Sequence, residues 1–215
     1  MDNIKIRLEE TNDYRAVEEL TRDAFWNLYT MGASEHLMVH NLRKSEDYIQ
    51  SLSFIATINN EIVGSVFYSK SIVVDELGNI YPSITIAPIS VNTTFQKNGI
   101  GSKLINHSIN EALKQEYKAI VIYGDPEYYK RFGFVGSKNY KISAIDGKYY
   151  KSLLVLELEK GYFSGIKKNG KFSYSPVFDI TPDEVDKFDA YFPAKEKLRT
   201  KSQEEFEKLI NILDE

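Results

Sequence analysis

Apolar and polar residues alternate at the start of the chain, and this pattern then changes to helical spacing. Residues 4–8 carry apolar side chains at every second position, which predicts a strand with one buried face. Asn12 or Asp13 can cap the helix that follows, and apolar residues three and four apart extend this helix to about Leu28. The same spacing predicts a second, shorter helix over residues 34–43.

The next segment has the pattern of a β-hairpin. Two β-prone runs, residues 54–58 and 62–68, flank the pair Asn59-Asn60. Asparagine tolerates the positive φ angles of a tight turn, so the two runs are expected to pair. A further turn is expected over residues 75–79.

A strand, a helix and another strand follow in that order. Residues 84–91 are rich in Ile and Val, although Pro88 lacks the amide hydrogen that a central strand position donates. Residues 95–115 contain a helical period, and residues 119–123 are a nearly all-apolar run typical of a strand covered on both faces. This order indicates parallel pairing of the two strands through a right-handed crossover.

The remaining elements are shorter. A helix is expected over residues 126–132 and a strand over residues 153–158. Thr181 and Pro182 make a good helix start, because threonine can cap the first turn and proline suits the first helical position. Residues 202–213 have the spacing of an amphipathic helix.

These elements predict one α+β domain over residues 1–178, followed by a helical C-terminal extension over residues 179–215. The composition is that of an ordinary globular protein, 42% hydrophobic and 27% charged. The formal net charge of −4 is opposite in sign to the basic surplus of proteins that wrap nucleic acid. No segment approaches the roughly 18 consecutive apolar residues of a membrane span. We therefore expect no nucleic-acid or membrane partner.

Two further observations restrict the protein class. The chain has no cysteine, which excludes disulfide scaffolds, cysteine nucleophiles and cysteine zinc sites. The N-terminal residues lack the apolar run of a signal peptide, so a cytoplasmic location is expected.

His36 and His40 have a spacing that can hold zinc, but Leu37 replaces the glutamate of the metalloprotease motif and no third ligand follows. We predict no metal site.

The segment Gln96-Lys97-Asn98-Gly99-Ile100-Gly101-Ser102 carries the strongest functional indication. Its two glycines let the backbone turn sharply and expose amide groups, and the predicted helix start adds the positive end of a dipole. Together these features favour a site for a pyrophosphate. A dinucleotide fingerprint would need a third glycine where Leu104 stands, and a Walker A loop would need Gly-Lys-Ser rather than Gly-Ser-Lys. Taken alone, the segment is also compatible with a plain glycine turn.

Gln-x-x-Gly-x-Gly after an apolar strand resembles the acetyl-CoA motif of the GNAT superfamily of N-acetyltransferases. Residues 124–134, with Tyr-x-x-x-Gly-Phe at their end, resemble a second GNAT motif that follows the fifth strand. The spacing between the two motifs suits one helix and one strand. Residues 174–178 and 188–197 resemble a branch of predicted, uncharacterised N-acetyltransferases, so the resemblance covers most of the chain.

The resemblance implies a GNAT-like mixed, mostly antiparallel central sheet flanked by helices, with strands 4 and 5 splayed at a bulge. Pro88 suits such a bulge because it cannot donate to a ladder. Acetyl-CoA is the implied cosubstrate, and a strand amide could polarise its thioester carbonyl. The implied cofactor-binding residues are Ile89, Ser90 and Val91 for the pantetheine arm and acetyl group, and Gln96, Lys97, Asn98, Gly99, Ile100, Gly101 and Ser102 around the pyrophosphate.

Two residues are candidates for the proton transfers. Tyr129 matches the family tyrosine near the sulfur of CoA, and a phenol is a competent proton donor to a thiolate. Tyr128 is its neighbouring competitor. Glu35 is the first candidate for the general base, because the family's second helix lines the acceptor cleft; a solvated helix-end carboxylate, or a water chain in place of one base, remains the alternative. Asp125 stands where many relatives carry asparagine.

The sequence therefore predicts an enzyme that transfers acetyl from acetyl-CoA to a primary amine by direct attack in a ternary complex. A small-molecule or peptide amine is the expected acceptor, and the net negative charge mildly favours a cationic one. The alternative is a non-catalytic acyl-CoA binding or sensing module that shares the loop but turns nothing over. Exposed strand edges are compatible with a homodimer.

Overall fold

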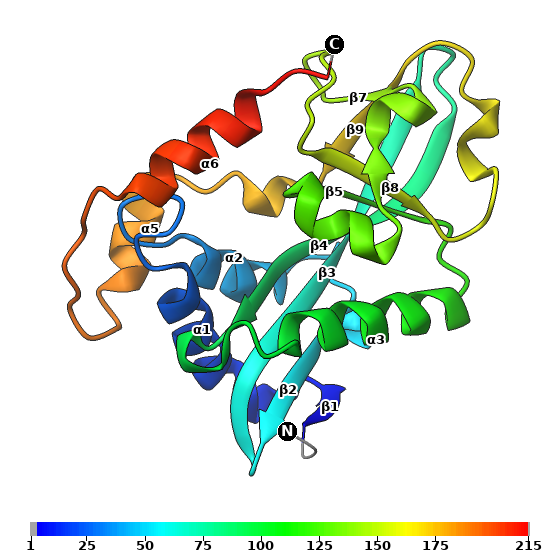
Figure 1. Cartoon of the computed structure of the whole chain (residues 1–215). Helices are drawn as coiled ribbons and strands as arrows, with labels where there is room; N and C mark the ends of the chain where they lie inside the picture. The colour runs from blue at the N-terminus through cyan, green and yellow to red at the C-terminus, as the bar shows by residue number, and fades with distance from the viewer. Residues whose placement is uncertain (1–3, 215) are drawn as a thin grey trace.

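A computed structural model describes residues 4–214 as a central sheet with helices on both faces (Figure 1). Over this range the chain forms nine strands: β1 (Lys5–Leu8), β2 (Phe54–Ile58), β3 (Glu61–Asp75), β4 (Ile80–Val91), β5 (Ala119–Tyr123), β6 (Val135–Gly136), β7 (Ile142–Ser143), β8 (Leu153–Glu157) and β9 (Gly170–Tyr174). The α-helices are α1 (Tyr14–Phe25), α2 (Glu35–Leu42), α3 (Ile100–Lys114), α4 (Pro126–Tyr129), α5 (Pro182–Asp189) and α6 (Lys201–Asn211).

The sheet is mixed and mostly antiparallel, as the sequence and the family resemblance predict. Its strand order is β1-β2-β3-β4-β5-β8-β6, and β9 pairs with β3 and β7. The parallel contacts are β4 with β5, joined through α3, and β7 with β9. The predicted hairpin is confirmed: Asn59 and Asn60 have φ angles of 50° and 67° between β2 and β3.

Alternate residues of β3 face opposite layers, because successive side chains of a strand point to opposite faces of the sheet. Val66 and Tyr68 belong to the core beneath α3, which includes Leu104. Phe67, between them, packs into the core beneath α1 and α2, which includes Val17. The helix α3 thus covers one face of the sheet, and α1 with α2 covers the other (Figure 1).

Several predicted boundaries are wrong. The first long helix ends at Phe25 rather than Leu28, because the chain turns at Asn27, where φ is 57°. The third helix begins at Ile100, so the glycine segment before it is a loop. β3 continues to Asp75 because its second half is paired on both edges, by β4 and β9. Polar residues such as Lys70 interrupt the apolar pattern there, which hid the strand from the sequence analysis.

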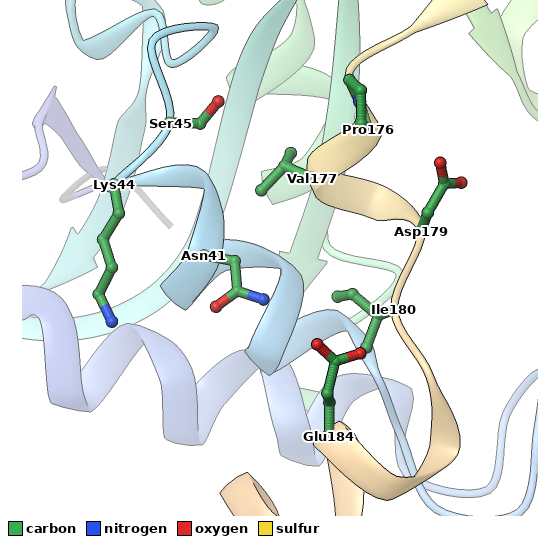
Figure 2. A pocket seen from close by; sticks show the side chains of 8 residues that line it. All are labelled: Asn41, Lys44, Ser45, Pro176, Val177, Asp179, Ile180 and Glu184. Atoms are coloured by element: carbon green, nitrogen blue, oxygen red, sulfur yellow. The ribbon is translucent and has the colours of Figure 1, made fainter.

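Two surface hollows lie apart from the predicted site residues. The first, of about 350 Å³, lies between the end of α2 and the segment leading into α5 (Figure 2). The second, of about 250 Å³, is lined by residues from 139–141, Glu157 and 161–166. None of the predicted site residues lines either hollow, so the candidate site has to be located from the strands and loops themselves. Within residues 4–214, no helix combines the length and apolarity needed to span a bilayer.

Candidate active site

The sheet opens between β4 and β5. The two strands share one pair of facing residues, Ile84 and Ile120, after which β4 runs on to Val91 without β5 beside it. The cause is visible in the pairing of β4 with β3: Val66 faces Ile89, but Tyr68 faces Ile86. One residue of β3 is thus opposite two residues of β4, which is the bulge predicted at Pro88. Beyond it, one edge of β4 is available to pair with a ligand.

The side chains of the predicted β4 residues divide between the two faces. Ile89 and Val91 point toward the core beneath α3. Ser90 is 2% exposed and points the other way, where its hydroxyl lies 3.1 Å from that of Thr21 and 2.7 Å from that of Ser65. Any contact of Ser90 with a ligand in the opening between β4 and β5 would therefore come from its backbone.

The glycine segment forms an exposed loop that leads into α3. Lys97 and Gly99 have φ angles of 62° and 79°, a backbone form that glycine adopts without strain. Two side chains brace the loop: Gln96 donates to the carbonyl of Val91 at 3.3 Å, and Asn98 donates to that of Phe95 at 3.3 Å.

The loop ends at the start of a long helix. Gly99 is the N-cap of α3 and has no side chain to accept from the amides of the first helical turn. These amides also have no partner within the helix, and they stand at the positive end of its dipole. The side chain of Ile100 is 1% exposed and packs in the core, so only its backbone faces outward. The arrangement suits an anion such as a pyrophosphate.

The short helix α4 places two tyrosines differently. A Cβ atom on Gly101 would lie 3.1 Å from the hydroxyl oxygen of Tyr128, so Tyr128 lies over the start of α3. The ring of Tyr129 lies against Gly124, where a Cβ atom would come within 2.5 Å of it, and beside Phe134 with ring centroids 5.4 Å apart. Burial raises the pKa of Tyr129 above its ordinary value, so its phenol keeps its proton at neutral pH.

Glu35 lies at the first position of α2. Its carboxylate accepts a hydrogen bond from the amide of Ser34 at 2.9 Å. Burial raises the pKa of Glu35 above its ordinary value, and this backbone bond opposes the shift without cancelling it. A carboxyl group with a raised pKa is suited to accept a proton near neutral pH.

Tyr29 was missed by the sequence analysis, because it lies in the turn after α1 and belongs to no motif. Burial raises the pKa of Tyr29, and the negative charges of Glu35 and Asp125 raise it further. The ionised form of Tyr29 would in turn raise the pKa of Tyr129, beyond the larger effect of burial. These electrostatic effects act between three separate segments of the chain: the turn after α1, the start of α2 and the segment after β5.

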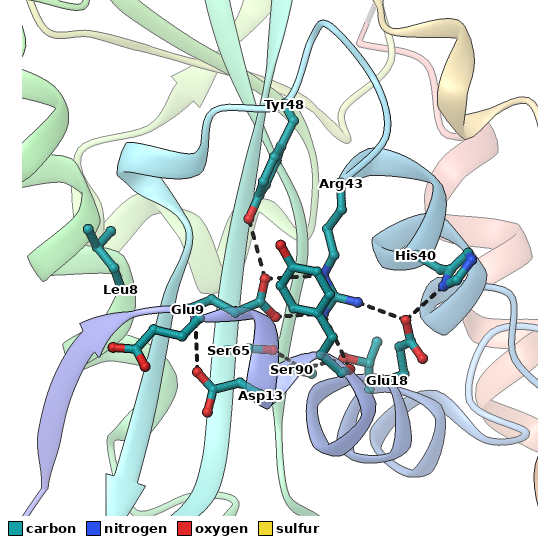
Figure 3. A network of polar contacts seen from close by, with 12 residues as sticks. Leu8, Glu9, Asp13, Glu18, His40, Arg43, Tyr48, Ser65 and Ser90 are labelled. Carbon is teal, nitrogen blue, oxygen red and sulfur yellow. Dashed lines mark hydrogen bonds and ion pairs between the residues drawn. The ribbon is translucent and has the colours of Figure 1, made fainter.

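A buried ionic network holds α1 and α2 in place (Figure 3). The guanidinium group of Arg43 donates to Glu9 at 2.6 Å and to Glu18 at 2.7 Å, and it lies 4.1 Å from the ring centre of Tyr14. The side chain of Glu9 is fully buried, and its carboxylate also accepts a hydrogen bond from the hydroxyl of Tyr48 at 3.3 Å. The network joins the end of β1 to both helices, so it fixes the segment that carries Tyr29 and Glu35.

The two histidines of α2 have separate surroundings. His40 lies 2.9 Å from Glu18 and 2.7 Å from the amine of Lys44. His36 is fully buried, and its Nε2 is 3.3 Å from an oxygen of Asp189 without hydrogen-bond geometry. Asp189 itself accepts two hydrogen bonds from Arg22, at 2.5 and 3.0 Å. Within the described residues, no group of three or more His, Cys, Asp or Glu side chains is arranged to hold a metal ion.

Comparison with known proteins places this geometry in context. Residues 50–136 match the family model described as an acetyltransferase (GNAT) domain. The uncharacterised N-acetyltransferase YhbS of Escherichia coli is 30% identical over 130 residues, which are 60% of this chain and 72% of that protein. The uncharacterised N-acetyltransferase YjhQ of E. coli is 26% identical over 106 residues, 48% of this chain and 58% of that protein.

Two crystal structures have the same fold. The E. coli YhbS structure, in complex with CoA, has a TM-score of 0.70 at 22% identity, covering 83% of this chain and 93% of its own. A Brucella melitensis GNAT acetyltransferase, in complex with acetyl-CoA, has a TM-score of 0.65 at 23% identity, covering 83% of this chain and 100% of its own.

Proposed function

Because the chain belongs to the GNAT family of N-acetyltransferases, we propose that it transfers acetyl from acetyl-CoA to a primary amine by direct attack in a ternary complex. The observation that carries this proposal is the opening between β4 and β5, with the segment of residues 96–102 following β4 and the helix that carries Tyr129 following β5. Relatives of the same fold bind CoA and acetyl-CoA. A non-catalytic acyl-CoA sensor remains the alternative.

The loop and β4 supply the binding of acetyl-CoA. The free amides at the start of α3 bind the pyrophosphate, and the unpaired edge of β4 at residues 89–91 pairs with the pantetheine arm. A backbone amide of the same edge donates to the thioester oxygen as negative charge develops on it. These interactions are made by the backbone, which is consistent with the inward position of the Ser90 side chain.

Glu35 and Tyr129 supply the proton transfers. Glu35 accepts a proton from the acceptor ammonium group, and the resulting amine nitrogen attacks the thioester carbonyl carbon. The carbon–sulfur bond then breaks, and Tyr129 donates its proton to the departing thiolate. The attacking nitrogen loses its second proton to the Tyr129 phenolate, and the first proton passes from Glu35 to solvent, giving the amide, CoA and the starting enzyme. Burial supports both roles, because it raises the pKa of the base toward neutrality and keeps the phenol protonated.

The experiment is release of the CoA thiol from acetyl-CoA over a panel of amines that contains amino acids, polyamines, aminoglycosides and peptides. Tyr129→Phe is expected to lower kcat by about 10- to 100-fold and to leave acetyl-CoA affinity unchanged, because it removes a proton donor and keeps the packed ring. Tyr128→Phe is the matched comparison. A larger loss of rate in Tyr128→Phe would reverse the assignment, and tight acetyl-CoA binding with no thiol release from any amine would favour the sensor.

A further inference from the structure

We propose that residues 196–214, the C-terminal strap, wall the acceptor side of the active site and restrict the acceptor to a small cationic amine. The proposal rests on the proposed acetyl transfer and adds a substrate class to it. The strap contains α6, no residue of which is buried, and it is fixed to the rest of the molecule near its two ends.

The first anchor is the turn after α1. The side chain of Asn27 accepts from the amide of Leu198 at 3.0 Å. The carbonyl of Asn27 accepts from the hydroxyl of Thr200 at 2.9 Å and from the side chain of Gln203 at 3.2 Å. Gln203 also donates to the carbonyl of Thr30 at 2.9 Å. The start of the strap and the turn that carries Tyr29 are therefore one hydrogen-bonded unit.

The second anchor is the loop before β8. The amide of Lys151 donates to the carbonyl of Ile212 at 2.9 Å, and the amide of Asp214 donates to the carbonyl of Tyr149 at 2.8 Å. The residues between them, Tyr150 and Leu213, form an antiparallel bridge. The strap therefore ends as a short piece of β-ladder.

The two anchors belong to opposite sides of the opening in the sheet. On one side, α1 is tied to β4 by the hydroxyl contact of Thr21 with Ser90. On the other side, the amide of Gly124, just after β5, donates to the carbonyl of Ser152 at 2.8 Å. The strap thus runs from the element attached to β4 to the element attached to β5, as Figure 1 shows for α6 and the C-terminus.

Phe206 connects the strap to the candidate catalytic groups. Its ring stacks on Tyr29 with centroids 4.1 Å apart and planes 25° apart. Tyr29 lies between Asn27 and Thr30, which both bond to the strap, and the chain continues from there into α2, which begins at Glu35. Phe206 is therefore a positioning residue that holds Tyr29 against the acceptor site. Glu35, the proposed base, lies at the start of α2, in the segment that follows Thr30, which bonds to the strap. A carboxylate at this position favours a cationic amine over a neutral or acidic one.

The restriction in size follows from the position of the strap. The glycine loop leads into α3, which packs on one face of the sheet, whereas Glu35 begins α2, which packs on the other face. The proposal therefore has CoA approach from the first face and the acceptor from the second. The strap crosses that second approach between its two anchors. A lysine on the surface of a folded protein would need the strap to be displaced, but a small amine would not.

The first test compares acceptors with the full-length protein and acetyl-CoA. We expect thiol release with 1,4-diaminobutane and other small cationic amines, and at least a tenfold lower kcat/KM with a short lysine peptide or a folded lysine-rich protein. Equal kcat/KM for the folded protein would overturn the strap proposal and leave the acetyl transfer standing. If none of the amines gives thiol release, the proposed function is overturned, and the strap proposal with it.

The second test uses variants of the strap. Phe206→Ala is expected to raise the KM for small amines by about 2- to 10-fold, because one aromatic stack is lost, and to leave the KM for acetyl-CoA unchanged. Ile210→Ala, at a position that is 37% exposed on the same helix, is the matched control and should change neither KM. Equal effects of the two variants, or a rise in the acetyl-CoA KM alone, would contradict the role of Phe206.

The third test locks the strap. The chain has no cysteine, so Tyr150→Cys together with Leu213→Cys introduces one disulfide across the bridge, at a facing pair of an antiparallel ladder. The oxidised enzyme is expected to keep small-amine turnover within about twofold of its reduced form, because a small amine does not need the strap to open. Oxidation that abolishes small-amine turnover, with each single variant unaffected, would show that the strap must open and would overturn the proposal.

Discussion

The two faces of the central sheet are organised differently. On the α3 face, the segment proposed to bind the pyrophosphate is seven consecutive residues, 96–102: a loop that ends at Gly99 and the first turn of α3. On the face of α1 and α2, the packing of the helices depends on partners far away in the sequence; Arg22 and Asp189, for example, are 167 positions apart. A local loop can be recognised as a motif, whereas an acceptor site assembled from distant segments can change without altering any motif.

The largest effect is expected at the proposed base. Glu35→Gln should lower kcat by about 100- to 10,000-fold, because it removes the proton acceptor and keeps the shape of the side chain. In the unaltered enzyme, kcat/KM should rise with pH as Glu35 ionises, with a midpoint above that of an ordinary glutamate because burial raises its pKa. This limb of the pH profile should be absent in the variant. Glu19→Gln, at an exposed position of α1, is the control. An unchanged pH profile in Glu35→Gln would favour a water chain over a single base.

A second effect is expected in the buried network of Arg43 with Glu9 and Glu18. Arg43→Met should lower the free energy of unfolding by about 3–5 kcal/mol, because it leaves Glu9 and Glu18 buried without their cation. Urea unfolding measures this change. Lys187→Met, which breaks an exposed pair with Asp183, should cost less than about 1 kcal/mol. Similar losses in the two variants would mean that the network does not fix α1 and α2 as described.

The third effect is a dependence of stability on pH. Burial, together with the positive charge of Arg22, lowers the pKa of His36 to about 4, although Asp189 opposes the shift. Because the folded pKa is below the ordinary value of about 6.5, the unfolded chain binds the proton first as the pH falls. Stability should therefore be complete above pH ~6.5 and fall toward pH ~4, with a loss of about 2 kcal/mol between pH 8 and pH 5. Urea titrations at pH ~8 and pH ~5 measure the free energy of unfolding, and His36→Leu should remove this part of its decrease. An equal decrease in the variant and the unaltered protein would contradict the role of His36.

The smallest effect tests the cofactor side. Gly99→Glu should weaken acetyl-CoA binding by roughly tenfold or more, because it adds an anion at the helix start that is proposed to bind a pyrophosphate. Gly78→Glu is a close control: its φ of 82° matches the 79° of Gly99, and open space surrounds both positions. The two variants carry the same backbone strain and the same charge. A difference between their acetyl-CoA affinities, measured by calorimetry, therefore reports on the binding site alone. Equal affinities for acetyl-CoA would rule out the proposed pyrophosphate site.

The sequence predicted most of the elements of the fold. The hairpin turn at Asn59 and the cap at Thr181 were predicted, because each depends on the backbone preference of a few adjacent residues. The bulge was implied by the family resemblance, and the missing amide hydrogen of Pro88 agrees with it. β9 and the second half of β3 were missed, because they pair with each other across about a hundred positions of sequence and their polar residues interrupt the alternation. The end of α1 was misplaced because Asn27 takes a positive φ, and the hydrogen bonds of its carbonyl to the distant C-terminal strap cannot be read from the local spacing.

By itself, the sequence determined the family, the mixed sheet and the loop before α3, since these follow from local residue preferences and from two motifs on adjacent elements. Only the tertiary structure placed Phe206 on Tyr29 and tied the turn after α1 to the C-terminal strap. It also turned the side chain of Ser90 toward Thr21 and away from the α3 face. The physical reason is that contacts between distant segments depend on how helices and strands pack, and no single segment contains that information.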